Sequence, residues 1–255
     1  MEIPLAKILG AIMIIGLRVS GLMLFAPFFA NAVIPPRIKA ILVIAITAVL
    51  YPVFAPQLEA LDLSRWPIIV GTETILGVAI GVATYAVFEA VQIAGQMLSI
   101  QMGYSLVNIL DPNTQVESTV VAFFHQSMAL LIFLSLNIHH WILRALAHSF
   151  EYLPPGTMTV NPRFAQAVLH EGAIILGLGV QIAAPVLAAT LLMDLILGLL
   201  GKSSPQMPLM LLGPAVKSML GVFILTVTIG FWPRVFEKYF GQSISYMEQL
   251  LHLAH

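Results

Sequence analysis

The chain has 255 residues, of which 59% are hydrophobic and only 9% are charged. Soluble domains are usually about 45–50% apolar and about 25% charged, so this chain has too few charges to cover a soluble surface. Eleven basic and twelve acidic residues give a net charge of −1, which excludes a strong electrostatic attraction to nucleic acid. Cysteine is absent, which excludes disulfides and thiolate metal sites. We therefore expect an all-α, polytopic membrane-type protein built of helical hairpins.

Predicted helices begin close to the N-terminus. The first apolar stretch, residues 8–34, lacks the positively charged start of a signal peptide, so we expect it to be retained. Pro35 and Pro36 should end it, because proline cannot donate a helical hydrogen bond. A second helix is predicted for residues 40–54 and a long third one for residues 67–101. At about 20 residues per span, the whole chain has room for about six or seven helical segments.

The following segments contain the clearest loop signal. Uncharged residues 118–143 predict another helix or a hairpin, with a possible polar turn at Asn137-Ile138-His139-His140. After it, the segment PPGTMTVNPR contains the proline, glycine and asparagine residues that are typical of a loop. We expect this loop to separate two halves, residues 1–160 and 161–255.

The second half continues the helical pattern. A helix is predicted for residues 164–200, and Pro185 should kink it or divide it. Another is predicted for residues 214–232, and the tail that follows is amphipathic. No strand pattern competes with these helices, and no internal repeat is evident.

Two short motifs resemble functional sites but lack a required residue. Gly201-Lys202-Ser203 resembles the end of a phosphate-binding loop, but Ile196 stands where the first glycine is needed, and the segment follows a helix. His170-Glu171 resembles the start of a zinc-protease motif, but Ile174 stands in place of the second histidine. We therefore expect no catalytic site, no cofactor and no metal.

Ionisable side chains occur within segments that are otherwise apolar: Arg18, Glu73, Glu89, Asp194 and Lys217. A charge at the centre of a membrane helix costs roughly 2.5–3.5 kcal/mol on insertion scales, so each should face protein or water. Two interpretations remain open. These residues form structural pairs between helices, or they face a water-filled path or a partner subunit.

The third predicted helix carries two distinctive faces. A polar stripe recurs at spacings of three and four residues: Glu89, Gln92, Gln96 and Ser99. A stripe of this kind should not face lipid. On a neighbouring face, Gly77 and Gly81 form a GxxxG pattern that permits close approach by another helix. We therefore expect this helix to be enclosed by protein.

A third polar face is predicted in the second half. Asp194, Gly198 and Lys202 recur every four residues, so they share one face of their helix. We expect this face to pack against another helix or subunit, although a charge at a helix end beside a polar turn would give the same pattern. Lys217, in the next predicted helix, is a further candidate for subunit packing or for facing a channel.

Several motifs spread over nearly the whole chain resemble one family. In the first half they are Arg18-x-x-Gly21 with Pro27, Pro35-x-Arg37, and GQMLSIQMG followed by Asp111-Pro112. In the second half they are AAPVLAATLLMDLILGLLGKSSPQM, Gly213-Pro214, Lys217 and Gly221. The chain resembles the FliR-type family, which is shared between flagellar export gates and virulence secretion systems. One departure is Pro208, where the family commonly has asparagine.

The resemblance implies a non-enzymatic, channel-forming subunit of the bacterial flagellar type III protein export gate, located in the inner membrane at the flagellar basal body. Implied partners are FliP-type and FliQ-type gate subunits, FlhB-type and FlhA-type export proteins, unfolded flagellar export substrates and membrane lipids. The two halves would then resemble the FliP-type and FliQ-type folds, and some apolar helices would be buried in the gate instead of spanning the membrane. The alternatives are the equivalent virulence subunit and a small-molecule or ion transporter. Internal repeats would favour a transporter.

The segment GYSLVNILDPNTQVE, residues 103–117, connects two long predicted helices without a clear helical period. A conduit wide enough for an unfolded chain would leak ions at rest unless something apolar occluded it. The resemblance implies that this loop is such a plug, and the alternative is an ordinary connection between helices. The candidate plug residues are Tyr104, Leu106, Val107, Ile109, Leu110, Asp111 and Pro112.

Overall fold

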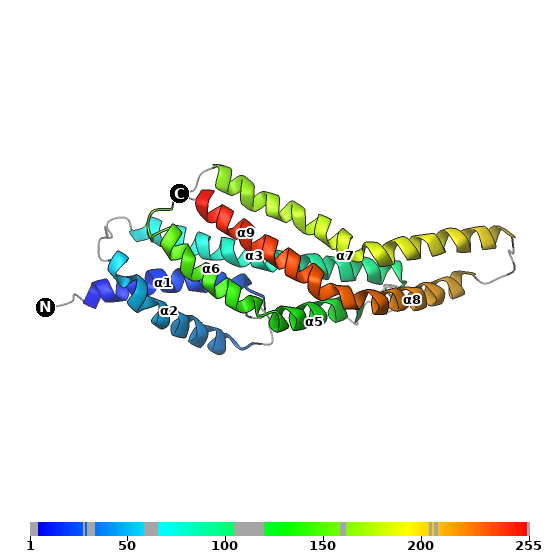
Figure 1. Ribbon diagram of the computed structural model, residues 1–255, viewed down its shortest axis with the longest axis horizontal. Helices are drawn as coiled ribbons and strands as arrows, with labels where there is room; N and C mark the ends of the chain where they lie inside the picture. The colour runs from blue at the N-terminus through cyan, green and yellow to red at the C-terminus, as the bar shows by residue number, and fades with distance from the viewer. Residues whose placement is uncertain are drawn as a thin grey trace. The chain divides into compact units, whose positions relative to one another are not determined.

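The computed structural model describes residues 5–27, 29, 34–58, 66–104, 120–158, 162–203, 206 and 209–253. Within these residues the chain is helical and contains no strand (Figure 1). The helices are α1 (Leu5–Phe25), α2 (Pro36–Leu58), α3 (Trp66–Gln101), α5 (Val120–Ser135), α6 (Ile138–Tyr152), α7 (Pro162–Ser203), α8 (Leu209–Thr228), the short 3-10 helix η3 (Ile229–Phe231) and α9 (Trp232–Leu253). The predicted all-α, polytopic membrane-type fold is confirmed.

Two helix boundaries near the N-terminus differ from the prediction. Helix α1 ends at Phe25, although the apolar pattern predicted a helix to residue 34. Pro27 explains the difference, because the residue before a proline is restricted to extended conformations and the proline lacks an N–H. Helix α2 begins at Pro36, four residues before the predicted start. A proline is well tolerated there, because the first N–H of a helix has no intrahelical acceptor.

A sharp bend occurs at the predicted polar turn. Helices α5 and α6 meet at an angle of 67°. Asn137 lies between them with φ 54°, in the left-handed region that asparagine tolerates better than most residues. Helix α6 then continues to Tyr152, beyond the predicted end of the hairpin.

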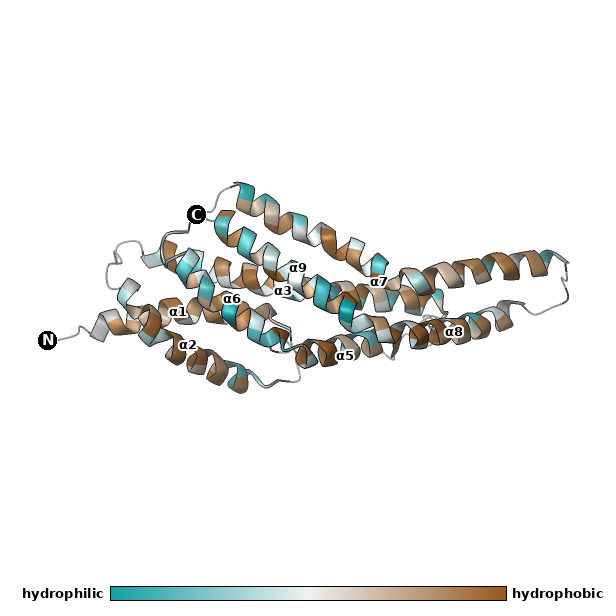
Figure 2. Ribbon diagram, viewed as in Figure 1, coloured by the Kyte–Doolittle hydropathy of each residue, from teal (hydrophilic) through white to brown (hydrophobic). Residues whose placement is uncertain are grey.

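Prolines in the second half do not interrupt their helices. Helix α7 includes Pro185, and α8 begins before Pro214 and includes it. The amphipathic tail forms α9, whose buried side includes Phe236, Phe240 and Met247. Figure 2 shows mainly hydrophobic residues on α2 and α8, and more hydrophilic ones along α9.

The described residues contain five helices that are long and apolar enough to cross a membrane, or up to six if the bent pair α5 and α6 forms one span. These spans differ widely in how much of them the chain itself covers. The window in α3 is 67% buried, whereas those in α2 and α7 are 11% and 17% buried. Most of α2 and α7 therefore offers apolar side chains to lipid or to other proteins.

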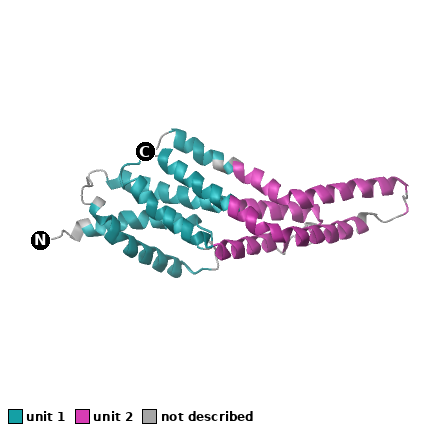
Figure 3. Ribbon diagram, in the orientation of Figure 1, with its two compact units in different colours: residues 1–87, 137–172, 239–255 teal, residues 88–136, 173–238 magenta. Residues whose placement is uncertain are grey.

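The chain forms two compact units (Figure 3). Unit 1 contains residues 1–87, 137–172 and 239–255, and unit 2 contains residues 88–136 and 173–238. Each unit therefore combines segments that lie far apart in the sequence. This grouping by contacts does not test the expected resemblance of residues 1–160 and 161–255 to two partner folds, which stays a prediction.

Candidate functional site

A buried ion pair lies in unit 1. Arg18 of α1 and Glu73 of α3 both have fully buried side chains, and Arg18 Nη2 lies 2.6 Å from Glu73 Oε2. Arg18 Nε also donates a hydrogen bond to Oε2, at 2.7 Å. Both guanidinium nitrogens therefore contact the same carboxylate oxygen of Glu73, and hydrogen bonds between charged groups of this kind are stronger than those between neutral groups.

The end of α6 completes this group, which we call the Arg18 cluster. Arg18 Nη1 donates to the carbonyl oxygen of Ser149 at 2.8 Å, and Nη2 donates to that of Leu153 at 3.0 Å. The carbonyl oxygen of Ser149 also accepts from the N–H of Leu153, at 3.0 Å, so Arg18 is its second donor. Carbonyl groups at the C-terminal end of a helix favour a cation. The N–H of Gly156 donates to Glu73 Oε1 at 3.2 Å. Arg18 thus joins α1, α3 and the loop after α6.

Helices α1 and α3 approach each other closely beside this cluster. A Cβ added at Gly77 would collide with the carbonyl oxygen of Arg18. One added at Gly21 would lie 2.9 Å from the carbonyl oxygen of Thr74, and one at Gly81 would lie 2.8 Å from that of Leu22. The GxxxG pattern of α3 therefore lies against α1 of the same chain.

A second polar group lies in unit 2 and connects three helices. Lys217 Nζ of α8 lies 2.9 Å from Asp194 Oδ1 of α7. Gln101 Nε2 at the end of α3 donates to Asp194 Oδ2, also at 2.9 Å. The Asp194 side chain remains 42% exposed. Gly198 lies one turn further along α7, and a Cβ added there would have no atom of another helix within 4 Å. Lys202, a further turn along, is exposed. This face is only partly covered by the chain itself.

The polar stripe of α3 is graded in burial. Ser99 is fully buried and donates to the carbonyl oxygen of Gly95 at 2.8 Å. Glu89 and Gln92 are half-buried, and Gln96 is exposed. The chain therefore does not enclose the carboxylate and the amides of the stripe. Their predicted contact with a partner or a channel stays a prediction.

Helix α3 ends in a glycine cap. Gly103 has φ 86°, and its N–H donates to the carbonyl oxygen of Ile100. The N–H of Tyr104 donates to the carbonyl oxygen of Ser99 at 2.9 Å. This pair of bonds is the Schellman arrangement, which favours glycine at the left-handed position. The predicted plug residues from Leu106 to Pro112 lie outside the described residues, and only Tyr104 is placed.

The described residues contain no group of three His, Asp or Glu side chains that could hold a metal ion. His125 of α5 is fully buried, with Nδ1 2.8 Å from the carbonyl oxygen of Val121 and its ring 4.9 Å from that of Trp232. It therefore packs as part of the aromatic core of unit 2. The predicted site residues thus form separate polar groups in the two units.

Several members of these groups were absent from the sequence-based prediction. The carbonyl groups of Ser149 and Leu153 and the N–H of Gly156 have no signature in the sequence, because every residue type except proline carries both groups. Gln101 was assigned only as a helix end. Gln101 follows Ser99 by two residues and therefore lies on a different face of α3 from the polar stripe. No pattern in the sequence indicates its contact with Asp194.

Comparison with known proteins identifies the family of this chain. The family described as "Bacterial export proteins, family 1" matches residues 9–243, which include almost every described helix. The chain belongs to this family. The FliR protein of Bacillus subtilis is 29% identical over 248 residues, covering 95% of both chains. That of Escherichia coli K12 is 32% identical over 218 residues, covering 84% of this chain and 78% of the relative. The FliR protein of Aquifex aeolicus is 26% identical over 216 residues, covering 83% and 82%.

These relatives are all named flagellar biosynthetic proteins. The predicted membership of the FliR-type family and the predicted role in flagellar type III export are therefore both confirmed. As a member of the bacterial export proteins with several apolar helices, the chain is a membrane component of an export apparatus and works with other proteins of that apparatus. The Arg18 cluster and the Asp194 group lie within the matched segment, residues 9–243.

Proposed function

We propose that this chain is a non-enzymatic, channel-forming subunit of the flagellar export gate in the bacterial inner membrane, at the flagellar basal body. It assembles with FliP-type and FliQ-type subunits, contacts FlhB-type and FlhA-type proteins, and passes unfolded flagellar subunits. The family match over residues 9–243 carries this proposal. The flagellar names of the relatives favour a flagellar gate over a virulence secretion system.

The exposed apolar surface of the chain supports assembly with partners. Large hydrophobic side chains are more than half exposed on several helices, including Val49 at 71%, Leu169 at 76% and Met219 at 75%. Extended apolar surfaces of this kind mark contacts with other proteins or with lipid. The best candidates for these contacts are α2, α7 and the span from Leu212 to Leu253, whose apolar windows are only 11%, 17% and 11% buried.

Affinity purification of the tagged, full-length chain from its native membranes tests the assembly. We expect FliP-type and FliQ-type subunits to copurify at constant ratios after gentle detergent extraction. A control with the tag on an unrelated polytopic membrane protein identifies subunits that bind the resin or the detergent micelle. Recovery of a homo-oligomer without other export proteins would contradict the proposal.

The polar stripe supports a protein or channel contact for α3. Gln92 Oε1 accepts from Gln126 Nε2 at 3.5 Å, whereas Glu89 is half-buried and Gln96 is exposed, so lipid at this face would leave the carboxylate and the Gln96 amide without partners. Replacing all three with leucine should prevent assembly while the chain stays in the membrane. Photo-crosslinkers at these positions should capture a gate subunit or a substrate. Capture of lipid alone would contradict this role.

We propose further that the segment from Tyr104 to Thr114 occludes the channel at rest. The glycine cap at the end of α3 supports this proposal, because Gly103 stops the helix immediately before this apolar segment of the sequence. Deletion of residues 104–114 should leave an assembled gate that conducts ions. An assembled gate that stays ion-tight after the deletion would show that the segment is an ordinary connection.

A further inference from the structure

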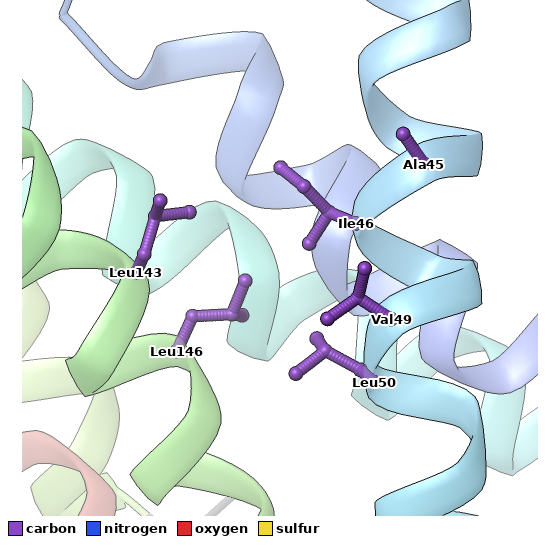
Figure 4. Close-up of a pocket in the computed structure, with 6 residues that line it drawn as sticks. All are labelled: Ala45, Ile46, Val49, Leu50, Leu143 and Leu146. Carbon is purple, nitrogen blue, oxygen red and sulfur yellow. The ribbon is translucent and has the colours of Figure 1, made fainter.

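An apolar groove lies between α2 and α6 in unit 1. It has a volume of about 260 Å³ and is lined by Ala45, Ile46, Val49 and Leu50 of α2 and by Leu143 and Leu146 of α6. Figure 4 shows the side chains of the two helices facing each other across open space. Every lining side chain is a hydrocarbon, so the groove offers side-chain packing to an occupant but no side-chain hydrogen bond.

The two helices run in the same direction along the groove. Phe54 of α2 stacks on Phe150 of α6 with ring centroids 5.0 Å apart, beyond the lining residues of both helices. Residue numbers therefore increase together along both walls, and this aromatic pair marks one end of the groove. The opposite end is the end at which α2 begins, at Pro36, and α6 begins, at Ile138.

That opposite end is basic. Lys39 precedes Ile46 by seven residues and Leu50 by eleven, spacings that place all three on one face of α2. Arg37, two residues earlier, starts on the opposite side of the same first turn and is exposed, so it would reach this end of the groove only through the length of its side chain. Residues 34–43 and 137–143, which form this end, include no aspartate or glutamate. A positive charge therefore stands at the mouth of the groove without a carboxylate beside it in these segments.

The dimensions fit one acyl chain of a lipid. Eleven residues of helix rise roughly 16 Å, so this distance separates Lys39 from Leu50 along α2. One leaflet of a bilayer is about half of the roughly 30 Å hydrocarbon core, or about 15 Å. The groove volume lies just below the range of roughly 300–1,000 Å³ for small-molecule pockets. A space of this size can hold part of an acyl chain but not a headgroup as well.

We propose that the groove between α2 and α6 binds one acyl chain of an anionic phospholipid, whose phosphate lies at Lys39 and Arg37. A helix, about 10–12 Å in diameter with its side chains, is too wide for a space of about 260 Å³, and an extended polypeptide would bring backbone N–H and C=O groups that the hydrocarbon walls leave unsatisfied. An acyl chain has no such groups. The bound lipid would fill the gap beside the stacked pair of Phe54 and Phe150, and would so support unit 1 from its apolar side.

Photo-labelling with phosphatidylglycerol that carries a photoreactive group in its acyl chain tests the proposal. The full-length chain is extracted with the subunits that copurify with it, labelled, and digested for mass spectrometry. We expect labelled peptides from residues 40–54 of α2 and from α6. Ala45→Phe, which places a ring in the groove, should reduce this labelling at least about fivefold, a difference of about 1 kcal/mol. Ala48→Phe is the matched control, because Ala48 is exposed on the same helix and does not line the groove.

Substitution at the basic end tests the headgroup separately. Each basic residue beside an anionic headgroup changes affinity about fivefold, so Arg37→Gln with Lys39→Gln should abolish most of the preference for phosphatidylglycerol over phosphatidylethanolamine. Leu143→Phe fills the groove from the other wall and replaces Ala45→Phe if that variant does not fold.

Three results would each overturn the proposal. They are equal labelling of the Ala45→Phe and Ala48→Phe variants, crosslinks from the groove to a polypeptide, and an unchanged lipid preference in the double glutamine variant. None of these results depends on whether export occurs, so they are distinct from failure of the proposed function.

Discussion

The guanidinium group of Arg18 is fully buried, and its position follows from the groups that surround it. It meets the carboxylate of Glu73, two carbonyl oxygens at the end of α6 and, at 4.2 Å, the ring of Phe150. Removing a charged group from water costs several kcal/mol, and an ion pair offsets that cost only when the remaining donors are also bonded. The carbonyl oxygens of Ser149 and Leu153 fulfil that condition here.

Arg18→Met should therefore strongly destabilise the protein, because it leaves the Glu73 carboxylate buried without its counter-ion. Breaking one partner of a buried pair costs about 3–5 kcal/mol. The thermal unfolding midpoint of the purified chain in detergent measures this loss. Adding Glu73→Gln to the same variant should recover part of the stability, since no unpaired charge remains and the amide oxygen can still accept from Gly156.

Arg163→Met in α7 is the control for loss of an arginine as such, because Arg163 is exposed. It should change the midpoint little. If Arg18→Met matched this control, or if the double variant were less stable than Arg18→Met alone, the Arg18 cluster would not stabilise the fold in the way described.

Helices α1 and α3 show how much of the packing between helices can be predicted from the sequence. The glycine pattern on α3 predicted close approach by another helix, and the buried charges predicted pairing or solvation. Neither pattern identified α1 as the helix that approaches Gly77. The Arg18–Glu73 contact joins residues 55 positions apart, and periodicity within a helix carries no information about such long-range partners.

Gly77→Ala should destabilise the packing of α1 on α3. The new methyl group would collide with the backbone carbonyl oxygen of Arg18, which cannot rotate away. Forcing an extra carbon into a packed core usually costs about 1–3 kcal/mol. Gly71→Ala on the same helix is the matched control, because nothing lies within 4 Å of the added carbon. Helix propensity alone should make that control more stable by up to about 1 kcal/mol. Similar unfolding midpoints for the two variants would contradict the close packing.

The Asp194 group tests a different property of α7 and α8. Asp194 is 42% exposed, and exposed ion pairs contribute about 0–1 kcal/mol, so Asp194→Leu should leave the amount of folded chain almost unchanged. If this face contacts another subunit, the same variant should impair gate assembly or secretion. Motility and recovery of the intact complex measure this effect. Normal motility and normal recovery of the complex would show that Asp194 contacts only Lys217 and Gln101 of its own chain and no other subunit.

Helix boundaries were predicted less well than helix positions. The apolar residues beyond Phe25 predicted a longer first helix than the structure has. Hydropathy is insensitive to the missing N–H of Pro27, which ends the helix. In contrast, Pro185 lies within a continuous α7. Its missing N–H removes one hydrogen bond from the helical ladder, a cost that neighbouring packing can offset. The same residue type therefore ended one helix and not the other.

For the whole molecule, composition and motifs were sufficient for fold class and family, because both depend on features present along the entire chain. The all-α membrane fold follows from 59% hydrophobic and 9% charged residues. The two compact units could not be predicted, because each combines segments that are distant in sequence. Their composition depends on long-range packing, such as that of Phe54 on Phe150 or of Phe88 on Phe133.

The central claim is that this chain forms part of the passage for flagellar subunits. Its most direct test is site-specific photo-crosslinking to an export substrate that is stalled in the gate. A stably folded domain fused to the end of the substrate that enters last prevents its complete passage. We predict crosslinks to the substrate from Gln96 and Tyr104, and none from Val53, which is exposed on α2. A stalled substrate that crosslinks to neither Gln96 nor Tyr104, or that crosslinks equally to Val53, would contradict the claim.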